Sequence, residues 1–279
     1  ITIEDVLNAN IEKEENYDTL EKYAKLINNA RNKNKKDYES KNISAQDAYA
    51  FNQKITPIAM KIAKKMDDFG RIYEYQNPSK RHAFSIPVEF IESTENRKFC
   101  PFPEKGMNGK SFRVTSKLMK TRTLAVKGKT KTSPHKGIDV GFGESGTPLF
   151  AHTKGTVSRI FNEKGGAGKS IKIEHDGYST VFFHLNDYPK RRYSKKEKFK
   201  KIEVGDDVRG GEIVGFLGNT GGSTAAHMHF ELLDQDGKRF PSHNERVEKM
   251  KNIGGIDGGK VDTNKLTFVP YKKIKYEKK

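Results

Sequence analysis

The stretch Gly218-Asn-Thr-Gly-Gly-Ser-Thr-Ala-Ala-His-Met-His-Phe-Glu-Leu-Leu233 joins a loop rich in glycine, serine and threonine to a short apolar run. Side chains alternate faces along a strand, so His227 and His229 are expected on one face, with Met228 and Phe230 on the other, against a core. Two imidazoles on one polar face suit a metal site or a proton-transfer site. An isolated His-x-His pair is more often a surface feature, so this stretch needs support from the rest of the chain.

Similar apolar runs recur upstream, and glycines separate them. They cover residues 155–161, 170–174, 180–184, 212–217 and 227–233. Short alternating runs bounded by turn residues predict an antiparallel β domain, which we expect to begin near residue 99.

The first 70 residues have a different pattern. Leu20, Ala24 and Ile27 recur at helical spacing among charged residues, and Ser44 with Asp47 three residues later is a helix-start signal. Thr56-Pro57 predicts the start of a further helix, which we expect to end at Gly70.

The predicted fold class is therefore α+β. A helical N-terminal region over residues 1–98 precedes an antiparallel β domain over 99–245, and a basic extension occupies 246–279. No period of 20–50 residues repeats, which excludes a solenoid.

Composition limits the partners of the chain. The 279 residues carry a net charge of +17, which favours a polyanionic partner, although a lysine-rich composition that serves solubility explains it equally well. A single cysteine, Cys100, excludes an intramolecular disulfide and a multi-cysteine zinc cluster. No apolar run is long enough to span a membrane, and no leader is visible after Ile1.

A second group of candidate ligands is His135-Lys-Gly-Ile-Asp139. Histidine and aspartate are both good zinc ligands, but four extended residues span ~13 Å, too far for one ion. A turn at Lys136-Gly137 that enters a strand at Ile138 would bring them together. A buried Asp139 paired with a cation is the alternative. His184 ends an apolar strand, where a lone histidine is more often structural.

Taken in order, these motifs resemble the M23 family of zinc metallopeptidases, the lysostaphin-like or LytM-like peptidoglycan endopeptidases. The resemblance covers about residues 99–235. It rests on the segments 133–139, 146–157, 204–215 and 218–230, together with His184.

The resemblance implies one Zn²⁺ per chain, held by His135, Asp139 and His229, with His184 and His227 as an unliganded catalytic pair. It implies bacterial peptidoglycan as the substrate. The segment 188–201 is longer and more basic than the family's usual connection. We expect it to project as a loop near the site, and its residues 190–201 could hold an anionic wall polymer, as could the tail 272–279.

Three settings fit this resemblance. The combination with a helical segment is similar to wall-lytic proteins of bacteriophage tails, in which residues 1–98 would contact other virion tail proteins. An exported bacterial autolysin of the same chemistry is an alternative, and so is a non-catalytic wall-binding module. The first two place the chain outside the cell, in a virion tail or in the bacterial cell wall. A nucleic-acid-binding role is disfavoured because the basic residues are scattered and no recognised motif accompanies them.

Overall fold

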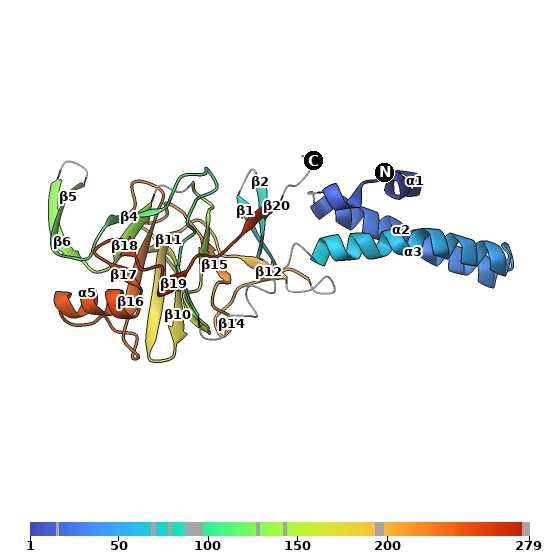
Figure 1. Ribbon diagram of the computed structural model, residues 1–279. Coiled ribbons are helices and arrows are strands. Elements are labelled where there is room, and N and C mark those ends of the chain that lie inside the picture. Colours follow the sequence, from blue (N-terminus) through green and yellow to red (C-terminus); the bar gives the residue numbers. More distant parts are fainter. Residues whose placement is uncertain are drawn as a thin grey trace.

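The computed structural model describes residues 1–14, 17–67, 71–77, 80–86, 97–126, 129–141, 144–192 and 198–274. Residues 1–14 and 17–67 form a helical arm that extends away from a larger β body (Figure 1). The arm consists of α1 (Ile3–Asn8), the 3-10 turn η1 (Ile11–Lys13), α2 (Tyr17–Glu39) and α3 (Ala45–Asp67).

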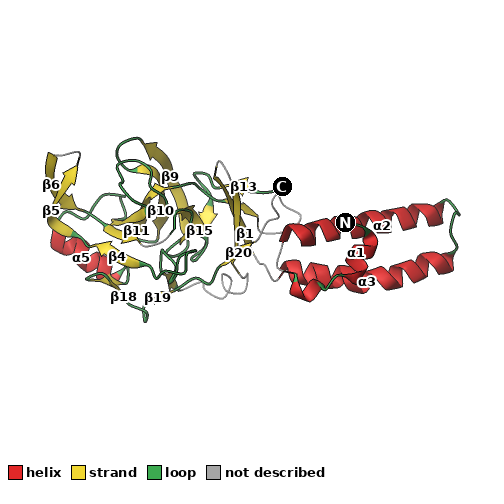
Figure 2. Cartoon of the chain, turned by 90° about the horizontal axis from the view of Figure 1, so that it is seen from above, coloured by secondary structure: helices red, strands yellow, loops and turns green. Residues whose placement is uncertain are grey.

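The helices predicted in the first 70 residues are present, and α2 and α3 lie side by side (Figure 2). Their apolar stripes meet, and Leu20, Ile27 and Ile62 are at most 2% exposed. The predicted cap is also present: the Asp47 N–H donates to Ser44 Oγ, and the Ser44 N–H donates to Asp47 Oδ2.

The predicted helix start at Thr56-Pro57 is wrong, because α3 continues through Pro57. Proline removes one backbone donor but fits a helix whose neighbouring turns are held by other contacts. Here Ile55 is buried against α2, and the Arg31 Nη2 donates to Thr56 Oγ1 over 3.0 Å. The predicted end at Gly70 lies outside the described residues.

The prediction that the helical region extends to residue 98 is also wrong, because α3 ends at Asp67 and a β-hairpin follows. β1 (Arg71–Asn77) and β2 (Lys80–Ile86) belong to a five-stranded sheet of order β13-β12-β1-β2-β20. Its other strands are β12 (Lys190–Arg192), β13 (Lys200–Lys201) and β20 (Lys272–Ile274).

This small sheet connects the arm to the body, because both of its faces are covered. Ile72 and Ala83 belong to the apolar cluster of the arm. Tyr73 and Phe84 pack instead with Phe99 and further aromatic residues of the body. Within the expected loop over 188–201, residues 190–192 and 200–201 are strands of this sheet, while residues 193–197 and 275–279 lie outside the described part.

The main sheet has seven strands, all antiparallel, in the order β14-β9-β10-β11-β16-β7-β4. They are β14 (Asp207–Val208), β9 (Gly155–Glu163), β10 (Gly168–His175), β11 (Tyr178–Leu185), β16 (His227–Leu233), β7 (Ile138–Gly141) and β4 (Arg113–Ser116). One face packs on the main core, in which Met228 and Phe230 are fully buried, as the alternation along β16 predicts.

Short elements complete the body. They are β3 (Lys98–Phe99) with β19 (Leu266–Thr267), β5 (Met119–Val126) with β6 (Lys129–His135), β8 (Pro148–Phe150) with β15 (Ile213–Phe216), β17 (Ile256–Asp257) with β18 (Lys260–Val261), and α5 (His243–Asn252). The predicted boundary at 245 is wrong, because α5 crosses it. Met250, Ile256 and Leu266 are buried in the main core, so residues up to Ile274 belong to the body.

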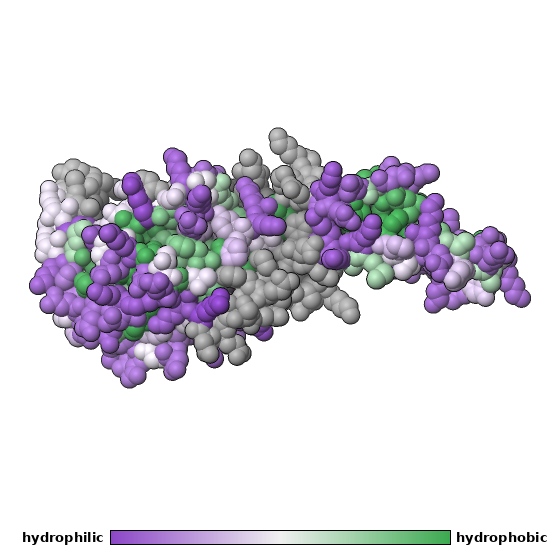
Figure 3. Space-filling view, viewed as in Figure 1, coloured by the Kyte–Doolittle hydropathy of each residue, from purple (hydrophilic) through white to green (hydrophobic). Residues whose placement is uncertain are grey.

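Hydrophilic residues cover much of the visible face of the β body (Figure 3). Among the described residues, no helix has the length and apolar character needed to cross a membrane.

The β10–β11 hairpin carries a half-buried histidine, His175, that predicts a pH dependence of stability. His175 Nδ1 donates to the Lys154 carbonyl over 2.8 Å, and Nε2 accepts from Thr180 Oγ1 over 2.9 Å. Both contacts suit a neutral ring, and burial lowers the pKa of His175 to about 4.

As the pH falls from 6.5 to 4, the unfolded imidazole takes up a proton that the folded one resists, so the free energy of unfolding should decrease. Urea unfolding measures the free energy of unfolding at pH 7.5 and at pH 5. The decrease in this free energy between the two pH values should be smaller for His175→Gln than for the wild type. Every other side chain is the same in both proteins, so the comparison isolates His175. An equal decrease in the two proteins would contradict this prediction.

Candidate metal centre

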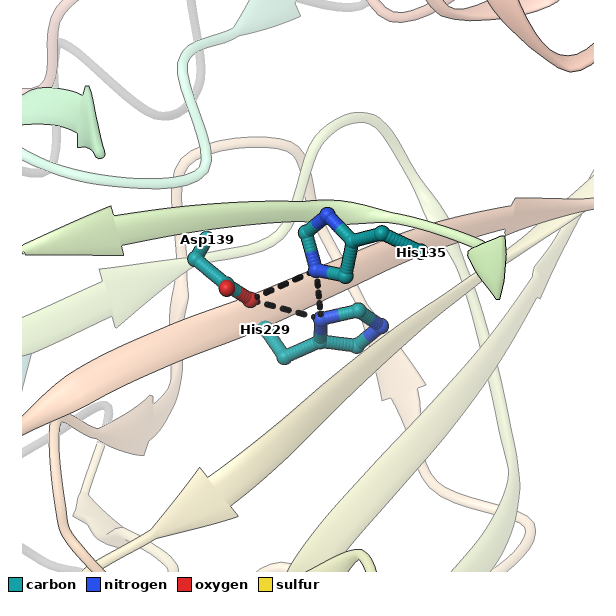
Figure 4. A group of neighbouring side chains, drawn as sticks. All are labelled: His135, Asp139 and His229. Carbon is teal, nitrogen blue, oxygen red and sulfur yellow. Dashed lines mark hydrogen bonds and ion pairs between the residues drawn. The ribbon is translucent and has the colours of Figure 1, made fainter. Parts of the chain in front are cut away.

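The turn at Lys136-Gly137 brings together side chains from three strands. His135 ends β6, Asp139 lies in β7, and Asp139 is directly opposite His229 of β16. A side chain at 137 would collide with the Phe230 carbonyl oxygen, so glycine lets the turn pass close to β16. The convergence predicted from this turn is therefore present (Figure 4).

Three donor atoms form a small triangle. Asp139 Oδ1 lies 3.0 Å from His135 Nε2 and 2.8 Å from His229 Nδ1, and the two nitrogens are 3.1 Å apart. Burial opposes ionisation of Asp139, but the neighbouring imidazoles of His135 and His229 outweigh it and hold the pKa of this carboxyl well below its usual range. The carboxylate is therefore charged at neutral pH.

The other ring nitrogens show where the imidazole protons lie. His135 Nδ1 is 2.5 Å from the Lys117 carbonyl, to which it can only donate. His229 Nε2 is 3.1 Å from Glu231 Oε1 and donates to this carboxylate. In neutral rings, this leaves lone pairs on His135 Nε2 and His229 Nδ1, directed at a carboxylate oxygen. Lone pairs that converge in this way repel one another unless a cation lies between them.

The donor set fits Zn²⁺. Zinc binds histidine nitrogen and carboxylate oxygen at ~2.0–2.2 Å with tetrahedral angles, which separates the donors by about 3.3 Å. The observed separations of 2.8–3.1 Å are close to this value. Three protein ligands leave a fourth position for water or substrate, as in catalytic rather than structural zinc sites. Among the described residues, this is the one group of His, Cys, Asp or Glu side chains that could hold a metal ion.

Charged side chains outside the triangle orient the ligands. Glu231 is 3% exposed, and Arg239 Nε donates to its Oε2 over 2.6 Å. Burial would raise the pKa of Glu231, but His229 and Arg239 outweigh burial and lower it to about 2. On the other side, Arg122 Nη1 donates to Asp139 Oδ2 over 2.7 Å, which leaves Oδ1 for the metal.

The sequence interpretation missed these orienting residues. Glu231 could have been found, because it follows His229 by two positions and must share its strand face. Arg122 could not, because the β5–β6 hairpin that carries it to Asp139 has no distinctive pattern.

Substitution of Glu231 tests its orienting role. Glu231→Gln keeps the shape but removes the charge that holds the His229 N–H, so zinc affinity should fall roughly 10-fold to 100-fold. Competition with a chromophoric chelator measures this change. Glu203→Gln, which removes an exposed carboxylate far from the triangle, should leave the affinity unchanged. Equal affinities for wild type and Glu231→Gln would contradict the prediction.

His184 and His227 lie next to the triangle, with ring centroids 4.8 Å apart. His184 Nδ1 donates to the Thr220 carbonyl and His227 Nδ1 to the Ala225 carbonyl, each over 2.9 Å, so both Nε2 atoms carry lone pairs when the rings are neutral. His227 Nε2 is 3.8 Å from Asp139 Oδ1. Burial lowers the pKa of His184 to about 4.

The backbone at His184 is held in an unusual conformation. Its φ of +60° is in the left-handed region, which a non-glycine residue rarely adopts. The loop after β15 passes so close that a side chain at Gly218 would overlap the backbone of residues 184–186. This contact fixes the end of β11 and therefore the ring of His184.

The five histidine and aspartate residues singled out from the sequence thus occupy one site, and three of them, His135, His184 and His229, line an open groove of about 970 Å³. Its floor is the exposed face of β10, β11 and β16, where Phe183 packs 5.3 Å from His229. One wall comes from β9 and the 163–167 loop, and the other from the foot of the β5–β6 hairpin and the turn 237–239.

A three-residue ligand set on an antiparallel sheet, open to a long groove, is the arrangement expected of a single-metal peptidase domain. Residues 133–241 match the model of peptidase family M23, and this part of the chain is an M23 peptidase domain. The metal implied by this family and by the donor set is zinc.

Curated relatives share this domain. The DD-carboxypeptidase/endopeptidase Mpg of Neisseria meningitidis is 37% identical over 98 residues, which cover 35% of this chain and 19% of the relative. The glycyl-glycine endopeptidase ALE-1 of Staphylococcus capitis is 29% identical over 144 residues, 51% of this chain and 35% of the relative.

A solved structure, the catalytic domain of lysostaphin from Staphylococcus simulans, is 21% identical, with a TM-score of 0.35 over 61% of this chain and 99% of the other. The chain thus spans between about a fifth and a third of the length of the two curated relatives.

Proposed function

We propose that this chain is a zinc metalloendopeptidase that cleaves the peptide stems or cross-bridges of bacterial peptidoglycan. The observation that carries the proposal is the triangle of His135 Nε2, Asp139 Oδ1 and His229 Nδ1, with sides of 2.8–3.1 Å, at the bottom of an open groove. An extended peptide with small side chains needs such a groove rather than a deep pocket. The names of the relatives Mpg and ALE-1 support peptide bonds of the wall as the target.

His135, Asp139 and His229 would hold the zinc ion. When bound, zinc polarises the scissile carbonyl and makes water acidic enough to attack at neutral pH. The residues beside the triangle then determine where the proton moves.

His227 is assigned as the group that moves the proton. Its Nδ1–H is held by the Ala225 carbonyl, so Nε2 can accept a proton from the attacking water. The water oxygen bonds to the carbonyl carbon, the C–N bond breaks, and the proton passes from Nε2 to the leaving nitrogen. His184 is a poorer base, because burial lowers its pKa to about 4. Its Nε2 lone pair is suited to accept a hydrogen bond from the attacking water and so to orient it.

The helical arm is assigned an attachment role, with a bacteriophage tail as the proposed assembly and an exported autolysin as the alternative. Residues 1–67 contain 12 Lys and Arg against 11 Asp and Glu, so the net charge of +17 lies almost entirely in the β body. A nearly neutral arm with exposed Tyr38, Tyr49 and Met60 suits contact with a protein better than contact with a polyanion. Detection of the chain in purified virions supports the tail role, and its detection only in bacterial culture supernatant supports the autolysin.

The enzymatic proposal is tested on purified peptidoglycans that differ in cross-bridge. Mass spectrometry of the released fragments should show new peptide amino termini with intact glycan strands. A chelator should abolish the release, and added Zn²⁺ should restore it. Fragments produced by glycan cleavage, or no release from any peptidoglycan, would overturn the proposal.

A further inference from the structure

The groove has two unlike arms on either side of the metal triangle. The strand register defines a central row in which Phe183 is opposite His229 and His229 is opposite Asp139. Toward one end, past His184, the wall is the 163–167 loop. There the Gly222 N–H donates to the Gly166 carbonyl over 2.7 Å, and Gly166 and Ala167 line the groove. Glu163 is the charged residue that lines this arm.

The other arm is cationic. One row along the sheet, Arg159 is opposite Lys172, Lys172 is opposite Val181, and Val181 is opposite Glu231. Glu231 follows His229 by two residues, so this row lies about 7 Å from the metal triangle along the strands. The turn carrying Lys238 lies directly over Lys172, because a side chain at Gly237 would overlap the Lys172 ammonium.

The charges of this arm do not cancel. Glu231 is neutralised by Arg239 and His229, and Glu174 lies 3.2 Å from Lys172. Arg159 and Lys238 are exposed, line the groove, and form no ion pair with a carboxylate of the described residues. Arg159 instead lies 4.6 Å over the ring of Phe161, which holds its guanidinium at the groove wall. Two cations that pair with no carboxylate of the described residues thus flank Lys172 at one end of the groove.

We propose that this end, the cationic arm formed by Arg159, Lys172 and Lys238, binds a free carboxylate of the peptide substrate. The proposal rests on the proposed function. An extended peptide advances about 3.3 Å per residue, so the carboxylate would lie about two residues from the scissile bond. A carboxylate can accept charge-assisted hydrogen bonds from guanidinium and ammonium groups, whereas a carboxamide lacks the charge. The substrate class is therefore an acidic stem peptide with a free carboxylate on one side of the cut, rather than an uncharged bridge alone.

The test uses cross-linked stem peptides from one purified wall, compared before and after conversion of the free carboxylates to carboxamides. The wild type should cleave the carboxylate form with a kcat/KM roughly 10-fold to 100-fold higher, as expected for hydrogen bonds to charged groups. Arg159→Gln/Lys238→Gln should reduce this ratio to below about threefold, and Arg159→Lys should retain most of it. Lys164→Gln, which removes one exposed positive charge from the loop at the other end of the groove, should not change the ratio. Two singly amidated peptides, one blocked within the stem and one at the C-terminus, identify which carboxylate is bound.

Binding to the His227→Ala variant separates this inference from the catalytic one. If the carboxylate form binds tighter than the carboxamide form but neither is cleaved by the wild type, the cationic arm is supported and the peptidase proposal fails. Equal binding of the two forms, or a preference that survives Arg159→Gln/Lys238→Gln, would overturn the inference.

Discussion

His135→Ala is expected to reduce bound zinc from about one ion per chain to near zero, and hydrolysis of peptidoglycan should disappear with it. The imidazole supplies one corner of the donor triangle, and its Nδ1 is committed to the Lys117 carbonyl. Alanine leaves two ligands, too few for a stable catalytic zinc site. Zinc is measured by mass spectrometry of the dialysed protein, and activity by clearing of a wall suspension. Asp139→Ala and His229→Ala should behave in the same way.

A matched control separates loss of the metal from loss of the fold. His243→Ala removes a histidine at the start of α5, outside the groove lining, and should keep both zinc and activity. The circular dichroism spectra of both variants should match that of the wild type. Retained hydrolysis in a folded His135→Ala protein would refute the ligand assignment.

His227→Ala should separate metal binding from turnover. The ring is adjacent to the triangle, but its Nε2 is 3.8 Å from Asp139 Oδ1, longer than any side of the triangle. The variant should therefore retain its zinc, while kcat falls roughly 10²-fold to 10⁴-fold, the usual contribution of a positioned acid or base. Zinc content and single-turnover hydrolysis of a defined stem peptide measure the two effects.

Ser223 provides a graded comparison for this variant. Its Oγ donates to the Ala225 carbonyl and lies 3.0 Å from His227 Nδ1, so Ser223→Ala should loosen the ring without removing it. We expect a loss of kcat much smaller than for His227→Ala. Loss of zinc in His227→Ala would make this residue a ligand, and a kcat within twofold of the wild type would exclude it from proton transfer.

Local patterns predicted the two halves of the site, and the resemblance to the M23 family joined them. Alternation along 227–233 gave the shared face of His227 and His229, and the turn at Lys136-Gly137 brings His135 next to Asp139 as expected. The roles of these residues as ligands, and of His184 as a catalytic partner, remain predictions that the variants above test. The placement within each half depends on short-range rules of strand geometry, which a single sequence contains. The pairing of β7 with β16 that joins the halves is long-range and was implied only by the resemblance.

Long-range pairing was not accessible in this way. In the small sheet, β1 pairs with β12 and β2 pairs with β20. Both partner strands lie more than 100 residues further along the chain. The apolar and aromatic residues at 72–75 and 83–86 suit a strand, but nothing in their surroundings indicated which strands would cover them. Similarly, burial of Ile55 and Ile62 against α2 overrides the helix-start signal at Pro57. Both errors arise where tertiary packing outweighs local preference.

The central claim is that His135, Asp139 and His229 hold one zinc ion. The most direct measurement is anomalous scattering from crystals of the zinc-loaded protein, recorded on both sides of the zinc absorption edge. We predict one anomalous peak per chain, within about 2.0–2.2 Å of His135 Nε2, Asp139 Oδ1 and His229 Nδ1. A peak held by other residues, or no peak between these three atoms in zinc-loaded crystals, would contradict the account.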